Sequence, residues 1–325
     1  MSLHVREAGL YSLLVDRGRA NTRHLGMPLG GAADRVALAL GNGLVGNAPD
    51  SVALEVTLAG PTLEAQHPIA CVVFGAAFQL LVNGRTIPSG TTFTLESGDL
   101  LRVGGTRTGC RGYLCVAGGF ESAAILGSRS ALEPVRAGDV LMCRAARIES
   151  HSLRLEEPVW RAGDVSPPVV SQSTGGLASP ARQGLLHVLD GPQRNWFADD
   201  RFFMQQYEVS PASNRMGVRF KGTPLLRRPG ELVSEAVAPG AVQVTNDGLP
   251  VVLGVDGQTI GGYPKIAHVI RADIDLLAQL RPGEHVRFVR VTPDEAEIAA
   301  KERAAFLKTW LHRLRLAERQ PVFLA

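Results

Sequence analysis

Lysine is scarce in this sequence of 325 residues, and so is any concentration of charge of one sign. Four of the 34 basic residues are lysines and the other thirty are therefore arginines, against 31 acidic residues. The formal net charge is only +3, and the arginines are scattered along the chain. Nucleic-acid-binding proteins gather basic side chains on one face, so this composition argues against a nucleic-acid partner.

Long apolar runs and cysteine motifs are also missing. No hydrophobic stretch approaches the roughly 20 residues that cross a bilayer, and the first residues lack the basic start and apolar core of a secretory signal. The four cysteines (Cys71, Cys110, Cys115 and Cys143) lie in apolar, strand-like segments at a spacing that fits no zinc site. We therefore expect buried, reduced thiols in a cytoplasmic protein without membrane attachment.

Several catalytic signatures are absent. The sequence has no G-x-x-x-x-G-K-[ST] phosphate loop, no H-E-x-x-H zinc motif, no G-x-S-x-G nucleophile turn and no Ala-Met-Lys-Met biotin-carrier motif. Its eight histidines are isolated from one another. These absences exclude a self-sufficient kinase, hydrolase or carboxylase of a familiar type. We expect no protein-held metal centre and an activity that depends on a partner.

Glycine and proline, in contrast, are abundant, with 36 and 20 residues. They mark many turns, which favours a mainly β fold with a few helices. A chain of this length is long for one core and suggests two domains. Residues 166–183, rich in serine, proline and glycine, cannot build a core. We predict an N-terminal β-barrel-like domain over residues 1–165, a linker over 166–183, and a C-terminal β domain with a terminal helix over 184–325.

Local patterns place the elements. Asp34 caps a helix that ends near Gly46, and Asn83-Gly84 signals a type I′ hairpin. Strands are expected over residues 70–74, 78–82, 91–95, 100–103 and 112–116 and, in the second domain, over 185–189, 216–220, 241–244, 251–255 and 285–291.

Two helices are predicted near the C-terminus. A short one starts at Asp273 and ends before Pro282-Gly283, and a long one begins at the capping box Thr292-Pro293-Asp294-Glu295. The long helix carries Phe306, Trp310 and Leu314 on one face. That face is expected to pack on the chain's own barrel; packing on a partner subunit is the alternative.

The segment 254–265 carries the most chemistry. It follows an apolar run typical of a buried strand and holds an acid, an amide, a hydroxyl, two adjacent glycines, a tyrosine and a lysine. Glycines let a ligand approach the backbone closely. Lys265 is suited to act there as a compact cation, a role for which the planar fork of arginine is a poor substitute. A solvated loop lysine explains the same pattern equally well.

A polar cluster in the first domain comprises Asp16, Arg19 and Asp34, with Asn42 and Glu55 nearby in sequence. It is either a ligand or subunit surface, or a buried network in which each charge has a partner. The sequence does not decide between the two.

Two more clusters lie in the second domain. They are Ser213, Asn214, Arg215 and Arg219, followed by Ser234, Glu235 and Gln243. Arg215 offers a bidentate fork for a carboxylate or phosphate; a turn with a solvated arginine is the alternative. The second cluster and the segment 254–265 flank neighbouring strand candidates, so we expect their side chains to converge on one pocket.

A series of short motifs runs through about residues 10–290 in order. They are Asp16-Arg17-Gly18-Arg19, Leu25-Gly26-Met27-Pro28, Gly31-Ala32-Ala33-Asp34, Leu44-Val45-Gly46-Asn47, Leu54-Glu55, Ala117-Gly118-Gly119, Leu126-Gly127-Ser128-Arg129-Ser130, Gly191-Pro192-Gln193, Ser213-Asn214-Arg215-Met216-Gly217, Ser234-Glu235, Pro239-Gly240-Ala241-Val242-Gln243 and Gly261-Gly262-Tyr263-Pro264-Lys265. With them the chain resembles the family of 5-oxoprolinase C subunits, also described as allophanate hydrolase subunit 2-like or biotin-dependent carboxyltransferase-like. It departs from the family pattern at Ala77, Ala131 and Gly257, where the family usually has Asp, Thr and Arg.

The resemblance implies two cyclophilin-like β-barrel domains and a subunit of ATP-dependent 5-oxoprolinase, which activates 5-oxo-L-proline by phosphorylating the lactam and yields L-glutamate. Phosphoryl transfer needs cations and usually a metal. Lys265 and Arg215 are then the expected anion partners, and Glu235 and Asp256 the expected proton or metal partners. The expected substrate-binding residues are Asn214, Ser234, Gln243, Gln258, Thr259, Gly261, Gly262 and Tyr263.

The resemblance also implies cofactors and partners. ATP with Mg is expected to be shared with a partner subunit. The partners are an allophanate hydrolase subunit 1-like protein (the 5-oxoprolinase B subunit) and a LamB/YcsF-like protein (the 5-oxoprolinase A subunit). Two alternatives remain: part of a biotin-dependent carboxyltransferase that acts on urea or a related amide, and a non-catalytic regulatory protein that binds a partner.

Overall fold

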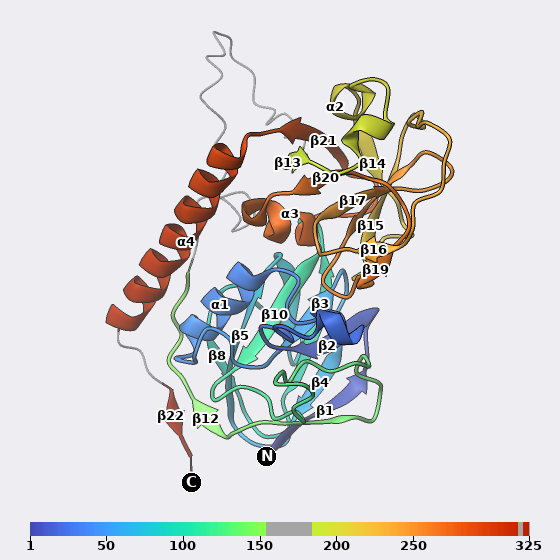
Figure 1. Ribbon diagram of the computed structural model, residues 1–325. Coiled ribbons are helices and arrows are strands. Elements are labelled where there is room, and N and C mark those ends of the chain that lie inside the picture. Colours follow the sequence, from blue (N-terminus) through green and yellow to red (C-terminus); the bar gives the residue numbers. More distant parts are fainter. Residues whose placement is uncertain (154–183, 318–320, 325) are drawn as a thin grey trace, which may run out of the picture. The chain divides into compact units, whose positions relative to one another are not determined.

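The computed structural model describes residues 1–153, 184–317 and 321–324, which fall into two units (Figure 1). The N-terminal unit comprises Met1–Val159, Ala278–Arg281 and Ala304–Ala325, and the C-terminal unit comprises Trp160–Leu277 and Pro282–Arg303. The predicted second domain, 184–325, differs from the C-terminal unit in that it also contains residues 278–281 and 304–325. The predicted linker, 166–183, lies outside the described residues.

The N-terminal unit is built from two antiparallel sheets. The larger has the strand order β11 (Val140–Met142), β1 (Ser2–Glu7), β4 (Thr62–Ala65), β9 (Leu100–Thr106), β6 (Phe78–Val82) and β7 (Arg85–Ile87). The smaller has the order β2 (Tyr11–Val15), β3 (Ala53–Thr57), β10 (Arg111–Val116), β5 (Ile69–Gly75) and β8 (Phe93–Leu95), and a short pair joins β12 (Ala146–Arg147) to β22 (Val322–Phe323). The five strands predicted in the first domain are all present.

Helix α1 (Arg35–Leu44) covers β5 and β10 (Figure 1). As predicted, Asp34 caps it, accepting a 2.8 Å hydrogen bond from the Ala37 backbone nitrogen. The hairpin between β6 and β7 turns at Asn83 and Gly84, whose φ values of 50° and 80° are those of a type I′ turn. A 3₁₀ turn, η1 (Arg23–Leu25), precedes the helix.

Helix α4 (Pro293–Leu316) begins at the predicted capping box, where the Thr292 backbone nitrogen donates to the Glu295 carboxylate at 2.7 Å. Its second half packs Phe306, Trp310 and Leu314 against the core of the N-terminal unit that surrounds α1. The prediction that this face packs on the chain itself is confirmed. This packing also explains why residues 304–325 group with the N-terminal unit.

The C-terminal unit contains a closed barrel with β13 (Gly184–Asp190), β20 (Lys265–Val269), β17 (Ala241–Val244), β18 (Pro250–Leu253), β15 (Gly217–Lys221), β14 (Tyr207–Val209) and β21 (His285–Arg290), in this order. The parallel pair β13–β21 closes it. Phe202, Tyr207, Phe220 and Phe288 form its aromatic core, with the Phe202 and Phe288 rings stacked at 4.5 Å. The smaller elements are η2 (Arg194–Trp196), α2 (Arg201–Met204), η3 (Arg271–Asp273), and the paired strands β16 (Glu235–Ala236) and β19 (Ile260–Gly261). Helix α3 (Ile274–Gln279) begins in this unit, and its last two residues belong to the N-terminal unit.

The predicted mainly β fold with a C-terminal helix is confirmed. So is the state of the cysteines, since all four are free and buried. Burial raises the pKa of the Cys143 thiol to about 12, which leaves it protonated and unreactive at neutral pH.

Candidate functional site

The segment 254–265 leaves barrel strand β18 and returns to the barrel at β20, and the short pair β16–β19 is built on its way. In that pair Glu235 stands opposite Gly261. On the barrel itself Gln243 stands opposite Lys265, at a bulge between β17 and β20. The topology therefore gathers two of the predicted sequence clusters around Gly261.

Lys265 is buried, with 7% of its surface exposed, and is not the solvated loop lysine that the sequence left open. Its ammonium group forms an ion pair with Oε1 of Glu235. Gln193 holds both partners: its Oε1 accepts from the Lys265 backbone nitrogen at 3.0 Å, and its Nε2 donates to Glu235 at 2.8 Å. Gln193 therefore fixes the Lys265 backbone and the Glu235 carboxylate, and Glu235 binds the ammonium group.

The Glu235 side chain is 41% exposed. The hydrogen bond from Lys265 lowers the pKa of its carboxyl below the ordinary value of 4.5, the bond from Gln193 lowers it further, and desolvation acts in the opposite direction. Glu235 is therefore ionised at neutral pH and can only accept hydrogen bonds. Both protein donors bind Oε1, and Oε2 accepts no hydrogen bond from the described residues.

Two side-chain amides approach Gly261. A methyl group on this glycine would lie 2.5 Å from Nε2 of Gln243 and 3.0 Å from Nε2 of Gln258. Only glycine fits without displacing them. Next to it, a methyl group on Gly262 would lie 3.3 Å from the Ser234 hydroxyl. Five of the predicted substrate-binding residues therefore lie together.

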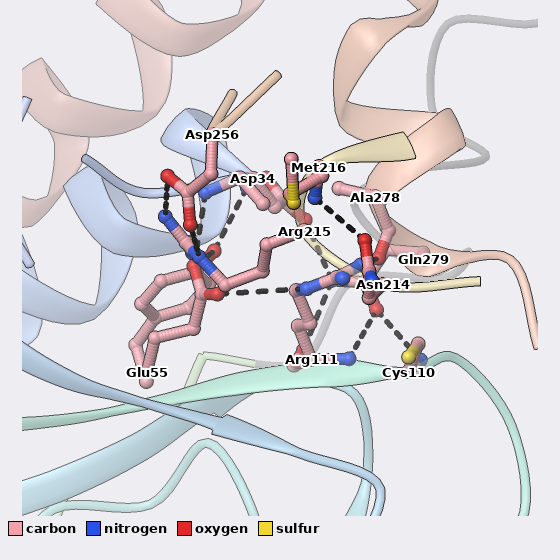
Figure 2. A network of polar contacts seen from close by, with 12 residues as sticks. Asp34, Glu55, Cys110, Arg111, Asn214, Arg215, Met216, Asp256, Ala278 and Gln279 are labelled. Carbon is pink, nitrogen blue, oxygen red and sulfur yellow. Dashed lines mark hydrogen bonds and ion pairs between the residues drawn. The ribbon is translucent and has the colours of Figure 1, made fainter. Parts of the chain in front are cut away.

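Arg215 and Asp256 form a separate pair. The guanidinium donates from Nε to Oδ2 of Asp256 at 2.6 Å and from Nη2 to Oδ1 at 3.0 Å (Figure 2). The backbone adds a bond from the Asp256 nitrogen to the Arg215 carbonyl at 3.2 Å, and Asn214 accepts from the Met216 backbone nitrogen at 2.9 Å. These contacts hold the start of the segment 254–265 against the turn 214–216. The four predicted catalytic residues thus form two ion pairs.

The remaining predicted residues have simpler surroundings. Thr259 accepts a backbone hydrogen bond from Val237 at 3.0 Å, and Tyr263 is 38% exposed. Gly257 is closed in by backbone, since a methyl group there would lie 2.9 Å from the Gly254 carbonyl oxygen. A larger residue at this position would therefore require the backbone to shift.

Gln193 was not among the predicted site residues, although it belongs to the Gly191-Pro192-Gln193 motif. Gly191 approaches β20 so closely that a methyl group would lie 2.3 Å from the Lys265 carbonyl oxygen. A glycine-proline pair directly before a polar residue was the available signal, because it marks a tight approach of backbone to a neighbouring strand.

In the N-terminal cluster, the buried Asp16 is bonded entirely within the chain. The Asp16 carboxylate accepts four hydrogen bonds, from the Ser128 and Ser130 hydroxyls and the Gly18 and Arg129 backbone nitrogens, at 2.6 to 2.8 Å. Burial raises its pKa, but these bonds outweigh burial and the net shift is downward. This favours the buried-network interpretation of Asp16.

The side chain of Gln279 is also hydrogen-bonded entirely within this unit. Its Oε1 accepts from the Cys110 and Arg111 backbone nitrogens, both at 2.9 Å (Figure 2). Its Nε2 donates to Asp34 at 2.8 Å and to the Arg111 carbonyl at 2.9 Å. The carboxamide is saturated although only 2% of the residue is exposed.

Among the described residues, no group of three or more His, Cys, Asp or Glu side chains could hold a metal ion. In the same part of the chain, no helix is long and apolar enough to cross a membrane.

Comparison with known proteins fits this architecture. The carboxyltransferase domain, subdomain A and B, family matches residues 25–290. The chain belongs to this family. It is 32% identical to the 5-oxoprolinase C subunit of Haemophilus influenzae over 296 residues, which cover 90% of this chain and 92% of the relative. It is likewise 32% identical to the 5-oxoprolinase C subunit of Escherichia coli over 320 residues, covering 96% and 98%.

A solved structure is also similar. The Kluyveromyces lactis urea amidolyase superimposes with a TM-score of 0.79 at 27% identity, over 95% of this chain. The chain spans only 20% of that protein.

Proposed function

We propose that this chain is a subunit of an ATP-dependent 5-oxoprolinase, which converts 5-oxo-L-proline to L-glutamate. The relatives that it matches along nearly their whole length are named as subunits of that enzyme. The observation that carries the proposal within the structure is the buried Lys265, fixed by Glu235 and Gln193 beside two glycines.

The reaction explains why such a cation is useful. A lactam carbonyl is a weak electrophile, and transfer of the γ-phosphoryl group of ATP to its oxygen, with release of ADP, turns that oxygen into a leaving group. Water then adds to the carbon, and the ring C–N bond breaks as the nitrogen takes a proton. A second water hydrolyses the resulting acyl phosphate, which releases phosphate and leaves the carboxylate of glutamate. Negative charge develops on oxygens during these steps, and a pre-positioned donor in a dry place stabilises it.

Within this chain Lys265 is the side chain suited to that role. Its position is fixed by the Gln193 contacts, and its partner Glu235 is exposed enough to be hydrated when the ammonium turns to another anion. The Arg215 guanidinium fits the role less well, because Asp256 engages it through two hydrogen bonds. We assign that pair to holding the loop.

The described residues do not fit a protein-held magnesium site, since they contain no cluster of metal ligands. No step is therefore assigned to a metal held by this chain. We propose that an allophanate hydrolase subunit 1-like protein completes the nucleotide site and that a LamB/YcsF-like protein completes hydrolysis. The four free cysteines suit a cytoplasmic complex.

One observation favours a second function. The matching family is described as a carboxyltransferase domain, and the K. lactis urea amidolyase superimposes over nearly the whole chain. The same donors would then orient urea, or a related amide, towards carboxybiotin.

The test is reconstitution. The chain is combined with its two proposed partners, and glutamate release from 5-oxoproline is measured with and without ATP and with this chain omitted. We expect turnover only in the complete mixture, and none from the chain alone. An ATP-dependent rate that does not change when this chain is omitted overturns the proposal; biotin-dependent carboxylation of urea by the complex would establish the second function.

A further inference from the structure

Gln243 is the polar side chain of the C-terminal unit whose burial is least explained. It lies on β17 between Val242 and Val244 and is 2% exposed. Within the described part of the chain its Nε2 is enclosed without any hydrogen-bond acceptor. A buried amide without a partner destabilises a protein, and an apolar side chain of the same length would fit better. A group retained against that disadvantage points to a partner that binds from outside.

The surroundings of Gln243 show where that partner would lie. Its Nε2 touches Gly261, which stands opposite Glu235 in the short pair β16–β19. Gln243 itself stands opposite Lys265. The amide donor of Gln243 therefore lies next to Gly261, and Glu235 stands opposite the same glycine.

Because Nε2 of Gln243 is enclosed, a substrate can reach it only if neighbouring residues move, and Gly261 of the β16–β19 pair is one of these neighbours. Each strand of this pair is only two residues long. An isolated two-stranded pair is marginally stable, so a small movement there costs little.

The chemistry of the partner follows from this donor and acceptor. A five-membered lactam holds its amide in the cis form, so its carbonyl oxygen and N–H lie on one edge of the ring. An open-chain secondary amide is trans and presents the two groups on opposite edges. A site that binds the cis edge needs one donor and one acceptor side by side.

We propose that Gln243 donates a hydrogen bond from Nε2 to the carbonyl oxygen of the substrate while Oε2 of Glu235 accepts from the adjacent N–H, so that the site selects a cis-amide edge. This inference rests on the proposed function and names the two residues that recognise the substrate amide. Urea also presents a carbonyl and an N–H on one edge, so the same pair would serve the second function.

The experiment uses the complete complex with Gln243→Met, which keeps the length of the side chain and removes the donor. The KM for 5-oxoproline is expected to rise about 3- to 10-fold, the range of one neutral hydrogen bond. The inhibition constant of cyclopentanecarboxylate, which has the ring and the carboxylate but neither carbonyl nor N–H, should stay unchanged. The Tm of Gln243→Met should equal or exceed that of the wild type, because no hydrogen bond of the folded chain is lost.

Two results overturn the inference. One is an unchanged KM for 5-oxoproline in Gln243→Met. The other is an equal weakening of 5-oxoproline and cyclopentanecarboxylate, which would show a distorted site. If the wild-type complex carboxylates urea and leaves 5-oxoproline intact, the proposed function fails, and the KM for urea in Gln243→Met decides the inference in the same way.

Discussion

Two glutamines of this protein are equally buried and differently bonded. Gln279, in the N-terminal unit, and Gln243, in the C-terminal unit, each expose 2% of their surface. Gln279 makes four hydrogen bonds through its carboxamide, whereas Nε2 of Gln243 makes none within the described residues. The first amide is completed by the chain itself, and the second is left for something else to complete.

The same contrast extends to the surrounding charges. Asp16 is saturated by four donors from its own unit, whereas Glu235 keeps one oxygen open and is 41% exposed. Polar residues and glycines occur in both places, so composition does not separate a structural network from a ligand site. Hydrogen-bond partners separate Asp16 and Gln279 from Glu235 and Gln243, although Nε of Arg19 in the N-terminal unit also has no partner among the described residues.

The largest expected effect tests whether the open cluster is the functional one. Lys265→Met should lower the 5-oxoprolinase activity of the reconstituted complex by at least about 100-fold, the size typical of removing one electrostatic donor. The control is Lys221→Met, since Lys221 also pairs with a glutamate but is 53% exposed on β15. It should retain full activity. Equal activity in both variants would remove Lys265 from the site.

A second variant measures how firmly the hydrogen-bond network around Gln279 is built. Gln279→Met should destabilise the protein by about 3 kcal/mol, because it removes four hydrogen bonds from a buried site. Urea-induced unfolding measures this change. Gln243→Met replaces an equally buried glutamine and should not lower the free energy of unfolding in the same measurement. Similar losses for the two glutamines would contradict the contrast between the two regions.

A third variant tests the contact between Gly261 and the unsatisfied amide. Gly261→Ala should cost about 1–2 kcal/mol, because the new methyl group overlaps Gln243 in a packed site. Combining it with Gln243→Ala should restore much of that loss, a coupling that a double-mutant cycle measures. Gly262→Ala is the control, since a methyl group on Gly262 would lie 3.3 Å from the nearest atoms. Strict additivity would show that the two residues do not touch.

The smallest effect is the pH dependence of Glu235. Its folded-state pKa lies below 4.5, chiefly because of the bond from Lys265. The stabilisation is therefore present above pH 4.5 and disappears as the pH falls through the folded-state value. Urea unfolding of the wild type and Glu235→Gln should differ at pH 6 and converge on acidification. A difference that grows towards low pH would refute this origin.

Local sequence signals were enough to predict most helices and strands. The Asp34 cap, the Asn83-Gly84 hairpin and the Thr292–Glu295 capping box each depend on a few consecutive residues, and each is present. The predicted domains differ more from the two units of the structure. Phe306 and Trp310 pack on the core of the N-terminal unit, and this packing joins the end of the chain to its beginning. No local pattern shows which sheet a distant helix face will cover.

The sequence by itself determined the strands, the caps, the buried thiols and the residues of the segment 254–265, because these follow from neighbours in the chain. Tertiary structure alone decided that Lys265 is buried against Glu235 and that Arg215 is paired with Asp256. It also decided that Nε2 of Gln243 has no acceptor among the described residues, whereas Gln279 makes four hydrogen bonds. Whether a charge or an amide is satisfied depends on residues that lie far away in sequence, and only folding brings them within hydrogen-bonding distance.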